Sequence, residues 1–222
     1  MARLFAGGSG SDNVRTPNTS NILNRFSYTV SVWAFRTGAD SGRMWTKGGV
    51  STQEHRMVSS SVSLSFQAPR WTGNDPSWTW NTPLTLDTWQ HLALTYIGDS
   101  TGTDPTLYLD GVDQGLRDSE VTPQGSFNNG STGDMTIGNG TFKTAAFHGR
   151  LCEFAYWDRI LTAGEVSILA AGKCPLRVRP NRLRIYFPIY GIPIERAFGR
   201  TAVFTGTTPA DHAPVGPPYG FD

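Results

Sequence analysis

The sequence of 222 residues has little net charge, only two cysteines and no long hydrophobic run. A formal net charge of +1 gives no overall field that would draw the chain to nucleic acid or to an anionic membrane. No stretch approaches the roughly 18 apolar residues that a membrane-spanning helix needs. We therefore expect neither nucleic acid nor a membrane among its partners.

Cysteine is too scarce for a disulfide-dense scaffold, because Cys152 and Cys174 are the only two. The sequence favours two reduced thiols with Cys152 packed in a strand, but the intervening segment could also fold back and bridge the pair. The N-terminal stretch MARLFAGGSGSDNVR lacks the uninterrupted apolar core of a secretory signal peptide. We therefore expect synthesis in the cytoplasm without export by that route.

Recognisable catalytic and metal-binding patterns are also missing. The four histidines lie in unrelated contexts without the spacing of a zinc site: they are His55, His91, His148 and His212. Neither cysteine stands in a nucleophile motif, and GGSGSD lacks the Lys-Ser/Thr of a phosphate-binding loop. Calcium would need oxygen donors such as Asp99, Asp104 and Asp134, but no dense D-x-D-x-D run is present. We expect no enzyme activity, no cofactor and no metal.

Glycine and proline are abundant instead, with 25 and 14 residues, and turn residues punctuate the chain about every eight to twelve positions. That spacing is typical of strands, and a chain of this length can form one all-β domain. Strands are expected at 3–7, 26–35, 61–67, within the hairpin 89–111, at 134–138 and at 149–158. In the hairpin, Leu92, Leu94 and Tyr96 share a face, and Leu107 and Leu109 can meet them across the sheet.

Two further strands show clear alternation. Val62, Leu64 and Phe66 should share one face of their strand, with serines on the other. In the strand 149–158, alternation places Cys152, Phe154 and Tyr156 on one face. The other face then carries Leu151, Glu153, Ala155 and Trp157.

One short helix is expected near 163–171. Thr162 followed by Glu165 fits a capping box, and Gly172 and Pro175 supply the stop. Beyond it, 175–191 returns to extended alternation. The final stretch APVGPPYGFD is too rich in Pro and Gly for regular structure, so it is either loose or held by a neighbour.

Several motifs, taken in order, resemble one family. They are WQHLAL (89–94), LYLDG (107–111), IGN (137–139) and FHGRLCEFAYWDRILTAGEV (147–166). This order is similar to the laminin-G-like, concanavalin-A-like jelly-roll superfamily over roughly residues 3–171. The resemblance implies a two-sheet antiparallel jelly-roll sandwich, with a domain at 1–174. We expect the C-terminal strand and Pro-rich arm at 175–222 to pack on the same domain or on a neighbour. Cys152 replaces the family's usual Asp, so any role of that Asp is in doubt.

The segment from Pro175 onward looks like the tail appended to such domains in bacteriophage structural proteins. It carries P-x-x-(aliphatic)-R-P, a strand ending YFP and a closing DHAPV. This second resemblance implies a virion structural protein.

Fold alone leaves the function open, since related jelly rolls include hydrolases, lectins and adhesive modules. The glucanases of this superfamily carry E-x-D-x-x-E, which places carboxylates on one face of a strand as nucleophile and acid. No such triplet is present. Glu153 and Asp158 would face opposite sides of a strand, while Asp110 and Asp113 flank a turn. A hydrolase is therefore disfavoured, and His91 is interpreted as a structural imidazole.

A tryptophan cluster is the first candidate binding site. RWTGNDPSWTW (70–80) holds Trp71, Trp78 and Trp80, and the last two project from one face if the segment is a strand. Adjacent indoles can stack on sugar rings, but they can equally fill a sandwich core, and we favour packing by about two to one because large aromatics dominate cores.

A basic stripe and the Pro-rich arm form the second candidate. Arg177, Arg179, Arg182 and Arg184 recur along the segment after the helix. Guanidinium groups suit carboxylates on a protein partner as well as phosphates. The alternative, a solubilising strand edge that prevents aggregation, is weighed equally. The arm residues expected to dock on a partner are Pro214, Pro217, Pro218 and Tyr219.

Three functions follow from these features. The leading hypothesis is a bacteriophage capsid decoration protein on the outer capsid surface, with the major capsid protein or sister copies as partners. The alternative is a carbohydrate-binding, lectin-like module that takes surface glycans. A hydrolase comes last.

Overall fold

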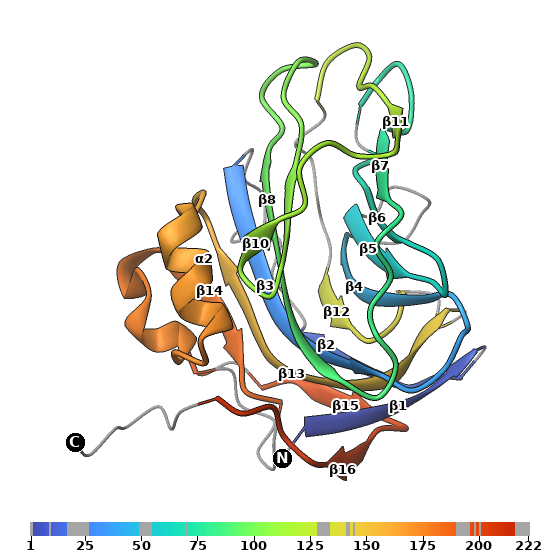
Figure 1. Ribbon diagram of the computed structural model, residues 1–222, viewed down its shortest axis with the longest axis vertical. Helices are drawn as coiled ribbons and strands as arrows, with labels where there is room; N and C mark the ends of the chain where they lie inside the picture. The colour runs from blue at the N-terminus through green and yellow to red at the C-terminus, as the bar shows by residue number, and fades with distance from the viewer. Residues whose placement is uncertain are drawn as a thin grey trace.

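Strands provide most of the regular structure in the computed structural model, which describes residues 2–8, 10–16, 27–48, 55–69, 71–127, 134–140, 143, 145–189, 196–197, 199 and 201–215 (Figure 1). The first eight strands are β1 (Ala2–Gly8), β2 (Asn13–Thr16), β3 (Ser27–Arg36), β4 (Gly42–Gly48), β5 (His55–Ser59), β6 (Leu64–Gln67), β7 (Ser77–Trp80) and β8 (Trp89–Ile97). The others are β9 (Thr106–Leu109), β10 (Val112–Asp113), β11 (Ser119–Val121), β12 (Asp134–Ile137), β13 (Ala146–Trp157), β14 (Leu183–Phe187), β15 (Val203–Thr205) and β16 (Thr208–Ala210).

These strands form two layers, which Figure 1 shows side by side. The first layer runs β10-β9-β8-β3-β13, and β1 and β14 continue it beyond β13. The second runs β4-β5-β6-β7-β11, with β12 pairing to β4. A single parallel bridge, Ala146 to Arg43, joins them, while the ladders within each layer are antiparallel. The predicted all-β, two-sheet antiparallel jelly roll is confirmed.

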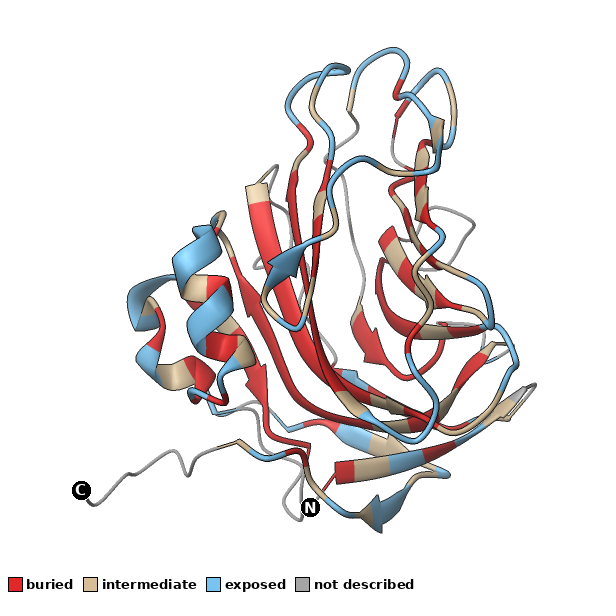
Figure 2. Cartoon of the chain, viewed as in Figure 1, coloured by how far each residue is buried: buried red, intermediate tan, exposed pale blue. Residues whose placement is uncertain are grey.

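The main core lies between the layers, where Figure 2 shows an almost continuous buried surface. The predicted hairpin is present as β8–β9, with Leu92 opposite Leu109 and Leu94 opposite Leu107. Leu92, Leu94 and Leu107 are fully buried, together with Trp45 and large aromatic groups of both layers, and the partly buried Leu109 packs against them. Val62 departs from its prediction, because it lies before β6 and is exposed.

The predicted helix is α2 (Ala163–Ala170), which covers the side of the first layer that faces away from the second (Figure 1). Thr162 caps it, and the reciprocal hydrogen bonds of Thr162 and Glu165 form the expected capping box. Val166 and Leu169 pack in a second apolar cluster with Trp157. No helix in the described part of the chain is long and apolar enough to cross a membrane.

The long strand β13 contains a β-bulge that the sequence pattern did not predict. Pairing with β3 shifts register between Cys152 and Ala155, and Glu153 adopts a φ of 53°. One extra residue in a bulge reverses the alternation beyond it. Leu151 therefore shares the main core with Phe154 and Tyr156, so the predicted grouping of Leu151 with Ala155 and Trp157 is wrong.

Candidate functional site

The tryptophan cluster does not form a surface platform. Trp78 and Trp80 share one face of β7, as their spacing predicts, but that face points into the core, and Trp71 is buried as well. The ring of Trp78 stacks on Phe66 with 5.7 Å between ring centroids. The favoured interpretation, packing in the core, is confirmed, and the alternative of a sugar-binding platform is excluded here because the indoles are buried. Each indole nitrogen donates internally: Trp71 to the Tyr96 hydroxyl at 3.2 Å, Trp78 to Asp104 Oδ1 at 3.0 Å and Trp80 to the Gly115 carbonyl at 3.3 Å.

The four arginines do not form a stripe along one strand. Residues 175–182 make two 3-10 turns, Pro175–Arg177 and Pro180–Arg182, before β14 begins at Leu183. Proline fixes φ at a value suited to the first position of each turn and cannot donate a ladder hydrogen bond. The expected extended alternation is therefore wrong for 175–182 and right for 183–187.

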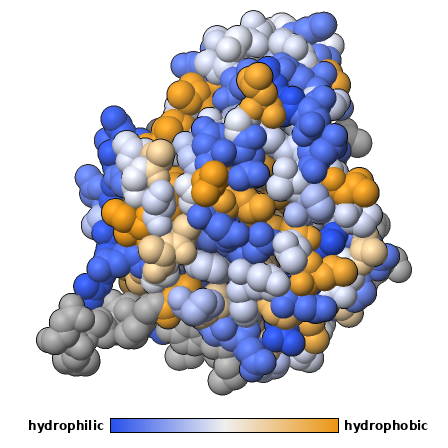
Figure 3. All heavy atoms as spheres, viewed as in Figure 1, coloured by the Kyte–Doolittle hydropathy of each residue, from blue (hydrophilic) through white to orange (hydrophobic). Residues whose placement is uncertain are grey.

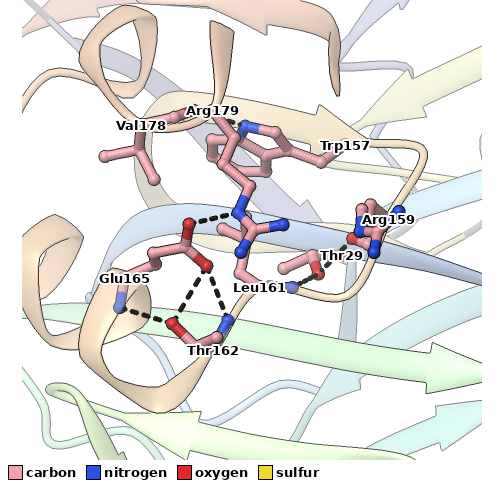
Figure 4. Close-up of polar contacts among 8 residues, drawn as sticks. All are labelled: Thr29, Trp157, Arg159, Leu161, Thr162, Glu165, Val178 and Arg179. Carbon is pink, nitrogen blue, oxygen red and sulfur yellow. Dashed lines mark hydrogen bonds and ion pairs between the residues drawn. The ribbon is translucent and has the colours of Figure 1, made fainter. Parts of the chain in front are cut away.

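Two of these arginines bind within their own domain. Arg179 has a left-handed backbone and donates to Glu165 of the capping box (Figure 4). Burial would raise the pKa of Glu165, but hydrogen bonds from Thr162 and Arg179 outweigh it, so that pKa is lowered. Arg184 Nη2 lies 2.7 Å from Asp158 Oδ2. Arg177 and Arg182 remain exposed on the turns.

The C-terminal segment packs on its own sandwich up to residue 215. β15 pairs with β2, and β16 pairs with β1. Ala213 is buried against Trp33, Cys152 and Ala2. Pro214 is exposed, whereas Pro217, Pro218 and Tyr219 lie outside the described residues. Of the two placements expected for this segment, residues 201–215 adopt the one on their own domain.

The same segment covers a group of buried polar side chains. The bulge turns Glu153 toward β14 and the C-terminal segment, where Tyr186 donates to its Oε2 at 2.6 Å. His212 Nε2 lies 3.0 Å from Glu153 Oε1. Cys174 Sγ lies 3.6 Å from the Tyr186 hydroxyl, and burial raises the pKa of both cysteine thiols. Both thiols are free and belong to different apolar clusters, so the structure contains no Cys152–Cys174 bridge.

His91 lies on β8, close to the buried polar side chains around Glu153, and it is fully buried. Its Nε2 lies 2.8 Å from Ser31 Oγ, and burial lowers its pKa to about 3, so it is neutral at pH 7. A narrow crevice passes over His91 between α2 and Val215, with Glu153 and Lys173 in its lining. This environment agrees with the structural role expected for His91.

The carboxylates do not assemble a hydrolytic pair or a metal site. Glu153 is engaged by Tyr186, Asp158 by Arg184, and Asp110 accepts from the backbone nitrogen of His91 at 2.8 Å. Asp104 is paired with Arg117 and Asp134 with Arg15. Within the described ranges, no three His, Cys, Asp or Glu side chains gather as metal ligands.

A different surface has the composition of a binding site. Strand register places five side chains in one row across the outer face of the first layer, which we call the open row: Trp89, Phe35, Arg150, Leu4 and Thr208. Opposite residues in antiparallel strands lie on the same face within contact distance. The neighbouring row, which includes His91, Trp33 and Cys152, is covered by the C-terminal segment. The open row lies just beyond that cover.

Aromatic rings and one cation dominate the open row. The rings of Phe35 and Trp89 are tilted with their centroids 5.5 Å apart, and both side chains are partly exposed. The guanidinium carbon of Arg150 lies 4.7 Å from the centroid of Phe35. Asp211, on the C-terminal segment, approaches Arg150 Nη1 at 3.4 Å. The row thus combines an apolar platform with donors for hydrogen bonding, a composition found in small-ligand sites.

The sequence alone predicts only part of the open row. Alternation in 26–35 places Trp33 and Phe35 on one face, but which residues lie beside them depends on register with β8 and β13. Neither the position of Trp89 beside Phe35 nor the cover over Trp33 can be read from a single strand.

The strand order and the two layers define an antiparallel jelly-roll sandwich. Residues 7–167 match the family described as the concanavalin A-like lectin/glucanases superfamily, and the chain belongs to that family. No curated protein matches the sequence.

Solved structures share the fold at low sequence identity. A proposed carbohydrate-binding protein from Bacteroides ovatus has 16% identity and a TM-score of 0.62, covering 97% of this chain, which spans 62% of that one. A heptameric SAP-like pentraxin from Limulus polyphemus has 16% identity and a TM-score of 0.55, and the match covers 76% of this chain and 81% of that one. The CBM40 of a Ruminococcus gnavus IT-sialidase, solved with α2,3-sialyllactose, has 10% identity and a TM-score of 0.53. The match covers 77% of this chain and 98% of that one.

Proposed function

We propose that this chain is a non-enzymatic glycan-binding module and that the open row is its ligand surface. The observation that carries the proposal is the partly exposed Phe35–Trp89 pair, held on two paired strands with an arginine beside it. Sugar rings offer apolar C–H faces that pack on aromatic rings, and their hydroxyls need nearby polar partners. Rigid strands hold such groups more accurately than loops do.

Two further points support this proposal. The Bacteroides ovatus and Ruminococcus gnavus proteins, whose names refer to carbohydrate binding, share the fold. The carboxylates that would be needed for glycoside hydrolysis are instead committed to internal partners, as for Glu153 and Asp158. We infer a protein that binds glycans without cleaving them.

Replacing Trp89 with alanine is expected to weaken glycan binding at least about tenfold, because central aromatic side chains contribute most of the affinity in such sites. The ligand is first found on a glycan array, and the dissociation constants of parent and variant are then measured by isothermal titration calorimetry. Circular dichroism checks that the variant keeps the parent fold.

Val62→Ala is the matched control, since Val62 is an exposed apolar residue near β6 in the other layer. It should bind as the parent does. Equal affinity of folded Trp89→Ala and parent would exclude the open row as the site. Hydrolysis of a bound glycan that disappears in Glu153→Gln would refute the non-enzymatic part of the proposal.

A second candidate is a decoration protein on the outer capsid surface of a virion, with a capsid protein as its partner. The observation that favours it is a set of three exposed apolar side chains on the otherwise polar segment that connects the layers: Val112, Leu116 and Val121 are 65%, 86% and 46% exposed. Figure 3 shows apolar side chains interspersed with polar ones on the face that carries β10 and β11 in Figure 1. Large exposed apolar side chains can become buried when a partner protein binds.

For this candidate, Leu116→Ser is expected to lower co-sedimentation with undecorated capsids at least about fivefold, because a large exposed apolar side chain would lose its burial at the interface. Val62→Ser, which removes an apolar group from another exposed site, should co-sediment as the parent does. Electron cryomicroscopy of particles from the native source shows whether the chain coats them, and bare particles would refute this candidate.

A further inference from the structure

Arg150 is incompletely bonded, although it occupies the middle of the open row. Its Nε is buried and has no hydrogen-bond partner among the described residues. Its Nη1 reaches only Asp211 Oδ2, at 3.4 Å, which is near the limit for a hydrogen bond. Arginine carries five donors arranged to fit a planar acceptor such as a carboxylate. The guanidinium therefore retains capacity for an anionic partner.

The position of this guanidinium is well defined. It lies over the Phe35 ring, 4.7 Å from the centroid, and 28% of the side chain is exposed. A cation over an aromatic face is attracted to the ring, and Arg stacks on such faces readily. The other members of the row, Trp89, Phe35, Leu4 and Thr208, are uncharged. Arg150 is therefore the charged group of the platform.

Asp211 holds Arg150 only loosely. Its side chain is 92% exposed, and it approaches the guanidinium through one long contact. An ion pair this exposed contributes little stability, because water and salt screen it. A ligand carboxylate that paired with both ends of the guanidinium would make shorter, charge-assisted bonds. Asp211 thus marks a position where an anion can lie and be displaced.

We propose that the open row selects carboxylate-bearing sugars, in which Arg150 pairs with the carboxylate while Phe35 and Trp89 receive the sugar ring. This inference rests on the proposed glycan-binding function and adds the chemical class of the ligand. Asp211 competes with the ligand carboxylate for the same guanidinium. The site therefore discriminates by charge as well as by shape.

The test uses uronic acid oligosaccharides and their carboxyl-reduced, neutral counterparts. Calorimetry measures both members of galacturonate, glucuronate and mannuronate pairs against the full chain. The parent should bind at least one acid about tenfold more tightly than its reduced form, since hydrogen bonds to charged groups contribute about that much. Arg150→Gln should remove this preference, because it lowers affinity for the acid by a larger factor than affinity for the reduced form. Asp211→Asn should raise affinity for the acid about threefold and leave the reduced form unaffected, since it removes only a weak, exposed competitor.

Arg182→Gln is the control, because Arg182 is an exposed arginine outside the open row, and it should retain the preference. Equal affinity of the parent for acidic and reduced sugars, with binding that still depends on Trp89, would overturn the inference and leave the glycan-binding function standing. A preference that survives in folded Arg150→Gln would also overturn it. Absence of binding to any glycan, acidic or neutral, would refute the proposed function itself.

Discussion

Truncation after Gly206 is expected to destabilise the sandwich by at least about 3 kcal/mol, equivalent to a fall of roughly 6–12 °C in Tm for a domain of this size. The deletion removes β16, which pairs with β1, and takes His212 away from the buried carboxylate of Glu153. A buried carboxyl group that loses one of its polar partners destabilises a fold more than a lost surface contact does. Urea denaturation followed by circular dichroism measures the loss.

Two further variants identify the cause. His212→Ala removes the contact with Glu153 but leaves β16 paired with β1. It should therefore reproduce a large part of the loss if that contact is the main cause. Truncation after Val215 retains every contact described for the segment. A loss after Val215 as large as that after Gly206 would contradict this explanation, and unchanged stability after Gly206 would mean that the segment contributes nothing to the domain.

Local patterns in the sequence predicted much of the fold. Alternating residues and turn spacing identified the strands that become β1, β3, β8, β9 and β12, and the Thr162–Glu165 pair identified the start of α2. These features depend on residues close together in the chain. A strand period or a capping box can therefore be recognised without knowledge of the neighbours.

The errors arise where distant segments decide the outcome. Spacing placed Trp78 and Trp80 on one face of a strand, but only the packing of the second layer shows that this face is internal. The pairing of β16 with β1 joins opposite ends of the chain, so no local pattern indicates it. The bulge at Glu153 is likewise a tertiary feature, because the side chain turns toward Tyr186 and His212.

The candidate site was only partly predictable for the same reason. Guanidinium groups and indoles occur both in the candidates taken from the sequence and in the proposed site, but the sequence emphasised the clusters at 70–80 and 177–184. Cross-strand register instead brings together Trp89, Phe35 and Arg150 from three strands. Residues far apart in the chain thus form the surface that we propose binds the ligand.

His91 is expected to make the protein acid-sensitive. Its pKa is lowered by burial from 6.5 to about 3, so the unfolded chain takes up a proton below pH 6.5 while the folded imidazole stays neutral until about pH 3. Protonation therefore favours the unfolded state, and stability is lost as pH falls from 6.5 toward 3. Between pH 7 and pH 4 this single group should account for about 3 kcal/mol of the loss. Urea denaturation at the two pH values measures it.

The neutral variant His91→Gln isolates this contribution. Glutamine can keep a hydrogen bond to Ser31 but cannot take up a proton in either state, so its stability should fall about 3 kcal/mol less than that of the parent over the same pH interval. Any packing defect lowers stability at both pH values and cancels in the difference. Glu153 and Lys173 line the same crevice, and both remain in parent and variant. Val62→Ala, which changes an exposed side chain without a titratable group, is the control and should follow the parent. Equal pH dependence in His91→Gln and the parent would show that the buried imidazole does not govern the acid response.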